Sequence, residues 1–128
     1  MSEESSQPNC GQGADVLLFA CSGAANVAEA ADRACRQLSY EGCGSMFCLA
    51  GLGAGIEAMV QKARDADQNI VIDGCEVHCA KKTFDRLGIR NYVHIEVTDL
   101  NIEKAAGVPA TEEQVAVVVR HTRQKMGK

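Results

Sequence analysis

From Asp15 onward, short unbroken runs of apolar residues alternate with longer segments in which apolar residues recur every three or four positions. Runs of this length without polar alternation are typical of buried β-strands. Strands that are apolar on both faces belong to parallel sheets covered by helices on each side. The pattern therefore predicts an α/β fold with four strands: DVLLFA (15–20), GSMFCLA (44–50), NIVID (69–73) and NYVHIEV (91–97).

The segments between the strands have the spacing of amphipathic helices. A final helix is expected to begin near Thr111, because Thr111 and Gln114 have the spacing of a capping box. Gly88 is suited to end the third helix. The core-facing residues are expected to be Val27, Ala30, Ala31, Ala34 and Leu38 in the first helix, Ile56, Met59, Val60 and Ala63 in the second (53–67), and Val77, Ala80, Phe84 and Leu87 in the third (77–88).

Right-handed crossovers between four parallel strands favour the strand order 2-1-3-4 in a three-layer, flavodoxin/Rossmann-like α/β fold. Ligands of such sheets bind beyond the carboxyl ends of the strands, here between the first and third. Residues 1–14 are rich in Ser, Gln, Gly and Glu, which predicts a flexible N-terminal tail. Residues 15–128 are expected to form a single α/β metal-binding domain, because cysteines lie at the ends of its strands.

Cysteines stand where three of the predicted strands end. Cys21 follows the first strand, Cys48 lies near the end of the second, and Cys75 follows the third. Because neighbouring strands lie ~4.8 Å apart, we expect these thiols to converge within ~10 Å. Cys79, four residues after Cys75, is expected one turn along the same side of the third helix, away from its core face. The four cysteines are thus placed for a site, and not for packing.

Composition narrows the chemistry of that site. The chain has seven cysteines, an odd number, and the residues before the apolar run 16–25 are acidic, unlike a signal peptide. A cytoplasmic protein is therefore expected, in which many thiols indicate metal or redox chemistry. The net charge of −4 argues against nucleic acid as a partner, and no apolar run has the ~20 residues that cross a membrane. Four thiolates suit zinc as the bound metal ion, and an iron–sulfur cluster is the alternative.

Several motifs resemble a known family. The stretches FACSGAANVAEAADRA, MFCLAGLGAGI, IDGCEVHCAKK and VTDL are similar to the DGC family, which is named after the triplet found here as Asp73-Gly74-Cys75 and to which zinc binding is ascribed. The similarity extends from Val16 to about Lys104. It implies that the family's four characteristic cysteines are Cys21, Cys48, Cys75 and Cys79. It implies a metal site more than an activity, and no reaction is assigned.

The other thiols and the histidines are given structural roles. Cys35 is expected in the core, Cys43 in a loop and Cys10 in the tail. Asp73 either caps the third helix or orients the thiols. His78 is a possible metal ligand but is expected to face solvent, whereas His94 within the fourth strand and His121 on a polar helix face are not expected to be ligands.

Two alternative functions use the same features. In a thiol redox or sulfur-transfer protein, helix N-termini would activate Cys21 and Cys75, and Cys79 would resolve the intermediate, although Cys21 with Cys75 is the better disulfide pair. A nucleotide-binding module would use Gly51, Gly53 and Gly55, which follow a predicted strand and open a helix. The spacing of these glycines departs from the dinucleotide-binding fingerprint, which makes this the weaker alternative.

Overall fold

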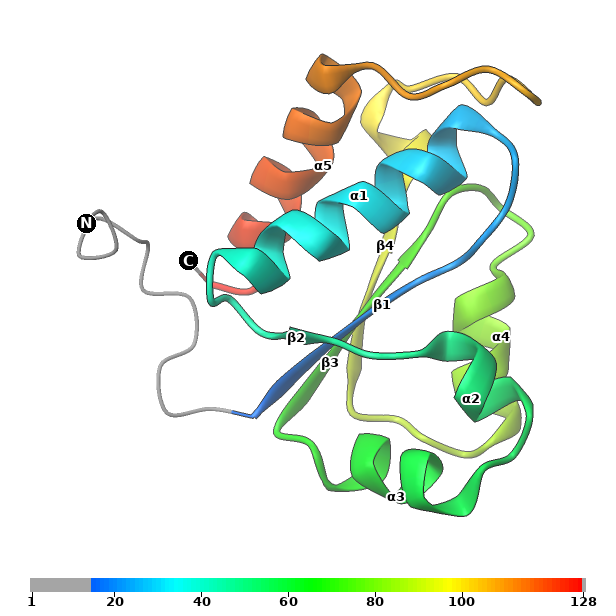
Figure 1. Ribbon diagram of the computed structural model, residues 1–128, viewed down its shortest axis with the longest axis vertical. Coiled ribbons are helices and arrows are strands. Elements are labelled where there is room, and N and C mark those ends of the chain that lie inside the picture. The colour runs from blue at the N-terminus through cyan, green and yellow to red at the C-terminus, as the bar shows by residue number, and fades with distance from the viewer. Residues whose placement is uncertain (1–14, 128) are drawn as a thin grey trace.

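The structure is a computed structural model that describes residues 15–127 (Figure 1). The expected tail, residues 1–14, lies outside the described residues, and so does Cys10. The elements in chain order are β1 (Val16–Ala20), α1 (Asn26–Tyr40), β2 (Ser45–Met46), α2 (Leu49–Gly53), α3 (Glu57–Asp65), β3 (Gln68–Asp73), α4 (Cys79–Arg86), β4 (Tyr92–Glu96), the 3-10 helix η2 (Val97–Leu100) and α5 (Glu112–Lys125).

Within residues 15–127 the strands form one parallel sheet of four, in the order β2-β1-β3-β4. This order confirms the prediction from right-handed crossovers. β1 pairs with β3 from Val16↔Gln68 to Ala20↔Ile72, and β3 pairs with β4 up to Asp73↔Glu96. The segments that follow β1, β3 and β4 therefore leave the sheet at the same edge.

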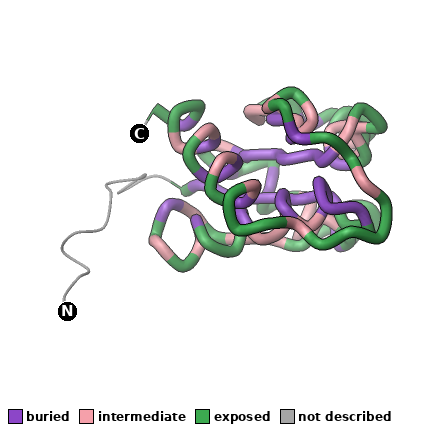
Figure 2. The backbone as a smooth tube through the Cα atoms, turned by 90° about the horizontal axis from the view of Figure 1, so that it is seen from above, coloured by how far each residue is buried: buried purple, intermediate pink, exposed green. Residues whose placement is uncertain are grey.

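Two separate cores cover the two faces of the sheet. Side chains such as Leu18 and Ile72 pack under α1 and α5, whereas Leu17 and Phe19 point to the opposite face, toward α2, α3 and α4. On that second face the rings of Phe19 and Phe84 meet edge to face with their centroids 4.9 Å apart. Figure 2 shows the buried backbone running between two more exposed layers. The molecule thus has the predicted three layers.

The second predicted strand is much shorter than its apolar run. β2 comprises only Ser45 and Met46, at the edge of the sheet, and Phe47 adds one further hydrogen bond to the Leu18 carbonyl oxygen at 2.9 Å. The rest of the run does not extend the strand, because Leu49 and Ala50 begin α2 instead. An edge strand has only one neighbour, so it is less completely covered than the central strands are.

The second predicted helix is broken into α2 and α3. Gly55, at φ +74°, lies at the break, and Ile56 precedes α3 with 49% of its surface exposed, so its predicted core position is wrong. Gly51 is buried where a Cβ would approach the Met59 sulfur to 2.4 Å, which lets α2 and α3 pack closely. Gly51 and Gly53 lie inside α2, so the chain does not form the strand–loop–helix context that a dinucleotide site requires.

The third predicted helix begins later than expected. α4 starts at Cys79, and Val77 lies before it with 47% of its surface exposed, whereas Ala80 and Phe84 are fully buried as predicted. Gly88 directly follows the C-terminal cap with φ +73°, the conformation for which glycine is preferred. The capping box of α5 is confirmed, because the Thr111 hydroxyl accepts from the Gln114 amide at 3.0 Å and the Gln114 side chain accepts from the Thr111 amide at 3.0 Å.

Candidate functional site

The four candidate cysteines all lie at the carboxyl edge of the sheet. Cys21 directly follows β1, Cys48 is the N-cap of α2, Cys75 stands in the turn after β3, and Cys79 is the first residue of α4. None of the four is in a disulfide bond. In Figure 1 the starts of α2 and α4 lie on the same side as the segments that leave β1 and β3. The predicted placement on one edge is therefore correct.

Cys21 is buried, with 7% of its surface exposed. Its Sγ accepts a hydrogen bond from the Gly74 amide at 3.2 Å. Burial raises the pKa of Cys21 to about 11. The hydrogen bond from the Gly74 N–H acts to lower this pKa, and the nearby charges of Asp73, Cys79 and Cys75 act to raise it. The Cys21 thiol is not at a helix N-terminus as expected, because α1 begins five residues later, at Asn26. In the metal-free chain Cys21 is therefore a neutral thiol near pH 7.

Cys75 lies in the turn between β3 and α4. Its side chain is half-buried, and the Lys104 ammonium lies 3.4 Å from its Sγ. The prediction that Cys75 and Cys79 share one helical line is wrong, because only Cys79 belongs to α4. Gly74 is required beside Cys75, since a Cβ there would come within 2.9 Å of the Ala28 backbone nitrogen. The turn is thus packed directly onto the start of α1.

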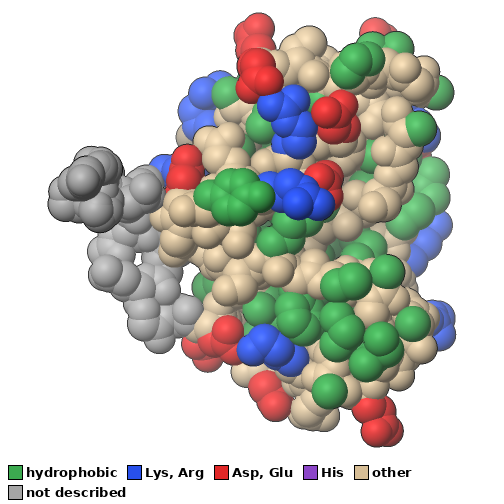
Figure 3. Space-filling view, viewed as in Figure 1, with side chains coloured by type: hydrophobic (Ala, Val, Ile, Leu, Met, Phe, Trp, Pro, Cys, Tyr) green, Lys and Arg blue, Asp and Glu red, His purple; other side chains and the backbone are tan. Residues whose placement is uncertain are grey.

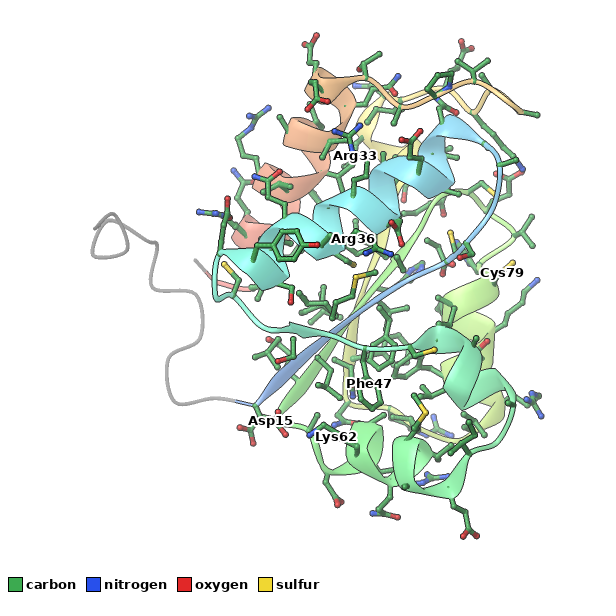
Figure 4. The ribbon with its side chains drawn as sticks, in the orientation of Figure 1. Asp15, Arg33, Arg36, Phe47, Lys62 and Cys79 are labelled. Atoms are coloured by element: carbon green, nitrogen blue, oxygen red, sulfur yellow. The ribbon has the colours of Figure 1, made fainter. Side chains whose placement is uncertain are left out.

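Cys48 and Cys79 are exposed and line a common cleft of about 580 Å³. The other lining residues are Ala20, Ser22, Asp32, Arg36, Met46, Phe47, Leu49, Ala50, Gly53 and Thr83. Figure 4 shows Arg36 reaching from α1, Phe47 from the segment after β2, and Cys79 at the start of α4. Figure 3 shows apolar side chains gathered over the region of α2 and α3. The cleft therefore combines two thiols, a guanidinium and an apolar wall.

The thiols are not arranged as a preformed metal site. Within residues 15–127, no group of three or more Cys, His, Asp or Glu side chains is gathered closely enough to hold an ion. The Cys21 thiol accepts a hydrogen bond from the Gly74 amide and the Cys75 thiol contacts Lys104, while Cys48 and Cys79 line the cleft. Four thiolates remain a donor set that fits a soft cation. Binding would require that these thiols move toward one another.

Asp73 holds the start of α4 from the end of β3. Its Oδ1 accepts from the Ala80 amide at 2.8 Å, and its Oδ2 accepts from the Lys81 amide at 3.0 Å. His94 on β4 lies against the same carboxylate, with its Nε2 2.9 Å from Oδ2. Burial acts to raise the pKa of Asp73, but the bonds from His94, Ala80 and Lys81 outweigh it, and the pKa is lowered. The helix-capping role expected for Asp73 is thus present.

His78 does not face solvent as expected. It precedes α4 in the left-handed region, at φ +59°, and its Nε2 lies 2.6 Å from Glu96 Oε1. Its ring meets that of His94 edge to face with the centroids 4.7 Å apart. The pKa of Glu96 is lowered by hydrogen bonds from the Thr98 hydroxyl and from His78. The sequence carries one signal of this arrangement: His94 and Glu96 are two residues apart, which puts both side chains on one face of a strand.

The remaining cysteines of the described chain lie away from this edge. Cys35 is fully buried in α1, as predicted, and burial raises its pKa. Cys43 lies in the turn after α1, as predicted, but it is almost fully buried in the core beneath α1 and α5. Burial in a core separates both residues from the exposed thiols of the cleft.

Comparisons with known proteins agree with these motifs. A family profile described as the DGC domain matches residues 17–122. The chain is also 31% identical over 91 residues to the anaerobic and virulence modulator AnvM of Pseudomonas aeruginosa, an alignment that covers 71% of this chain and 70% of that protein. No solved structure matches, and no helix within residues 15–127 is long and apolar enough to cross a membrane. The profile spans most of the sheet and all four edge cysteines, and the chain therefore belongs to the DGC domain family.

Proposed function

We propose that this DGC-domain protein binds a zinc ion through the thiolates of Cys21, Cys48, Cys75 and Cys79. The observation that carries the proposal is that all four cysteines lie in segments beyond one edge of the sheet and that none of them is in a disulfide. Zinc takes such ligands in tetrahedral geometry with Zn–S distances near ~2.3 Å. The four cysteines lie beyond the carboxyl ends of parallel strands, which is also where ligands of this fold class bind.

Binding would draw the more movable thiols toward the fixed ones. Cys21 is anchored by β1 and Cys79 by α4, whereas Cys48 follows a strand of only two residues. Lys104 is an exposed, flexible side chain, so it can leave Cys75 when a cation arrives. Formation of the site then requires a shift of the segment around Cys48 and displacement of one ammonium, and the sheet stays as it is.

The proposal is tested by zinc titration of single cysteine variants against a chelating indicator. Replacing Cys21, Cys48, Cys75 or Cys79 by Ser should weaken zinc binding, because each removes one thiolate. Cys35→Ala is the matched control, since it removes a thiol that lies in the core beneath α1. Equal affinity in all five variants and the parent would contradict the proposed ligand set.

A second candidate function, thiol redox or sulfur-transfer chemistry, is favoured by the surroundings of Cys75. A half-exposed thiol beside an ammonium is typical of reactive cysteines, and Lys104 lies 3.4 Å from Cys75 Sγ. The Pseudomonas relative is named an anaerobic and virulence modulator, and a thiol site that reacts with oxidants would suit such a role here.

Lys104→Met gives each candidate its own readout. A zinc site should bind zinc as well or more tightly when the competing ammonium is removed. A reactive thiolate should instead lose its nearby cation, so Cys75 should be alkylated more slowly than in the parent. A reversible disulfide or a persulfide in the parent, found by mass spectrometry together with no bound metal, would favour the second candidate.

A further inference from the structure

Two imidazole–carboxylate pairs lie side by side where β3 and β4 end. Asp73 and Glu96 are register partners in the sheet. Asp73 is paired with His94 at 2.9 Å, and Glu96 is paired with His78 at 2.6 Å. Because the two rings contact each other edge to face, the four side chains form one connected group, which we call the His–carboxylate clamp.

The clamp brackets Cys79. The Asp73 carboxylate that holds His94 also accepts the amides of Ala80 and Lys81, the second and third residues of α4. On the other side of Cys79, His78 is tied to Glu96 on β4. The backbone on both sides of this thiol is therefore fixed to the sheet.

The clamp also fixes the turn that carries Cys75. At its start, the Gly74 carbonyl oxygen accepts from the Thr98 amide at 3.2 Å. At its end, His78 adopts a left-handed conformation that is unfavourable for a residue with a side chain and persists only where surrounding contacts hold it. The contact between His78 and Glu96 is one such restraint, and the hydrogen bond from the His78 amide to the Cys75 carbonyl oxygen at 3.2 Å is another.

We propose that His78, His94 and Glu96 are positioning residues of the thiol site, acting through the backbone that carries Cys75 and Cys79. The Asp73 side chain is only 1% exposed and that of Glu96 14%. Replacing a buried ion pair by well-packed apolar residues is often neutral or stabilising, so stability alone does not require the buried Asp73 carboxylate. The effect on zinc rests on the proposed function, but the effect on the thiols of the metal-free chain does not.

The test uses full-length His94→Phe and Glu96→Gln. The first variant keeps a ring but removes the bond to Asp73, and the second keeps the side-chain size but weakens the bond to His78. Tyr92→Phe is the matched control, because it removes the 2.7 Å bond between Tyr92 and Asp85, which joins β4 to α4 away from the thiols. His94→Gln is the conservative variant, since its amide can still donate to Asp73.

The measurements are the alkylation rate of each cysteine in the metal-free chain, by peptide mass spectrometry, and the affinity for zinc. Loss of a hydrogen bond in His94→Phe, or its weakening in Glu96→Gln, should raise the rates of Cys75 and Cys79 by about fivefold. Zinc affinity should fall by about 10–100-fold, the usual effect of losing a group that orients metal ligands. Cys48, the Tyr92→Phe control and His94→Gln should stay within about twofold of the parent.

The proposal is overturned if both variants leave Cys75, Cys79 and zinc binding within twofold of the parent and only lower the melting temperature, as Tyr92→Phe does. Should His94→Phe not fold, Glu96→Gln decides the question alone. If the parent binds no zinc, the proposed function fails, but the alkylation rates still decide whether the clamp positions the thiols.

Discussion

Gly74 illustrates how a single residue in the DGC triplet is dictated by packing. Its backbone lies against the start of α1, where an added Cβ would be 2.9 Å from both the Ala28 nitrogen and the Val27 carbonyl carbon. These are backbone atoms of a helix, which cannot move aside as a flexible side chain does. The glycine therefore allows β3 and α1 to approach, and it also places an amide 3.2 Å from Cys21 Sγ.

Gly74→Ala should destabilise the fold by about 1–3 kcal/mol, the usual cost of forcing an extra carbon into a packed site. Gly53→Ala is the control, because nothing lies within 4 Å of its added Cβ and the residue belongs to α2. That change should be neutral or stabilise by up to about 1 kcal/mol. Urea denaturation measures both, and equal stability of the two variants would contradict the close approach at Gly74.

Cys21 should react more slowly than Cys48 with iodoacetamide at pH 8 in the presence of a chelator. Cys21 is buried, and with a pKa of about 11 its thiolate fraction at pH 8 is on the order of one in a thousand. Cys48 is exposed. Peptide mass spectrometry follows each thiol over time, and comparable rates for the two would show that Cys21 is not held in its buried position.

Among the elements, α4 shows where prediction from sequence reaches its limit. Helical periodicity correctly predicts its core face at Ala80 and Phe84, because periodicity reports burial directly. Asp73 is among the expected caps of this helix, but the predicted start is too early, because its carboxylate reaches the Ala80 amide, seven positions along the chain. A cap at that distance leaves no local pattern that gives the first residue of the helix. The opposite holds for α5, whose Thr111 cap is local and was predicted.

Asp73→Asn should destabilise the protein by about 2 kcal/mol near neutral pH, because an amide cannot accept hydrogen bonds at both terminal atoms as the carboxylate does. The folded-state pKa of Asp73 lies below its unfolded value. Its stabilisation is therefore fully present above the unfolded pKa of about 3.9 and is lost as pH falls through the folded pKa.

Thermal unfolding between pH 2 and pH 7 tests this expectation. The parent should lose more stability than Asp73→Asn as the solution becomes acidic, so the difference between the two should shrink below about pH 4. A difference that stays constant over this pH range would mean that the ionised carboxylate does not hold α4.

In the whole molecule, chain topology brings the thiols together. Alternating strands and helices with right-handed crossovers were enough to predict the order β2-β1-β3-β4 and hence the shared edge of Cys21, Cys48 and Cys75. Topology does not determine how each thiol is directed. That depends on local partners such as the Gly74 amide and Lys104, which periodicity does not report.

Zinc should also stabilise the whole fold, because its ligands come from segments after β1, β2 and β3 that separate on unfolding. At a free zinc concentration 100 times the dissociation constant, the gain is about 2.7 kcal/mol. Thermal unfolding with and without zinc measures it. The double variant Cys48→Ser/Cys79→Ser should show a smaller shift, and a shift as large as in the parent would place the ion elsewhere.

Metal content is the most direct test of the proposed zinc site. The protein is purified without a chelator or an affinity metal, its metals are quantified by elemental mass spectrometry, and its reactive thiols are counted before and after denaturation with chelator. We expect one zinc per chain, with Cys21, Cys48, Cys75 and Cys79 protected until the metal is removed. No zinc, with Cys48 and Cys79 freely reactive in the folded chain, would contradict the site.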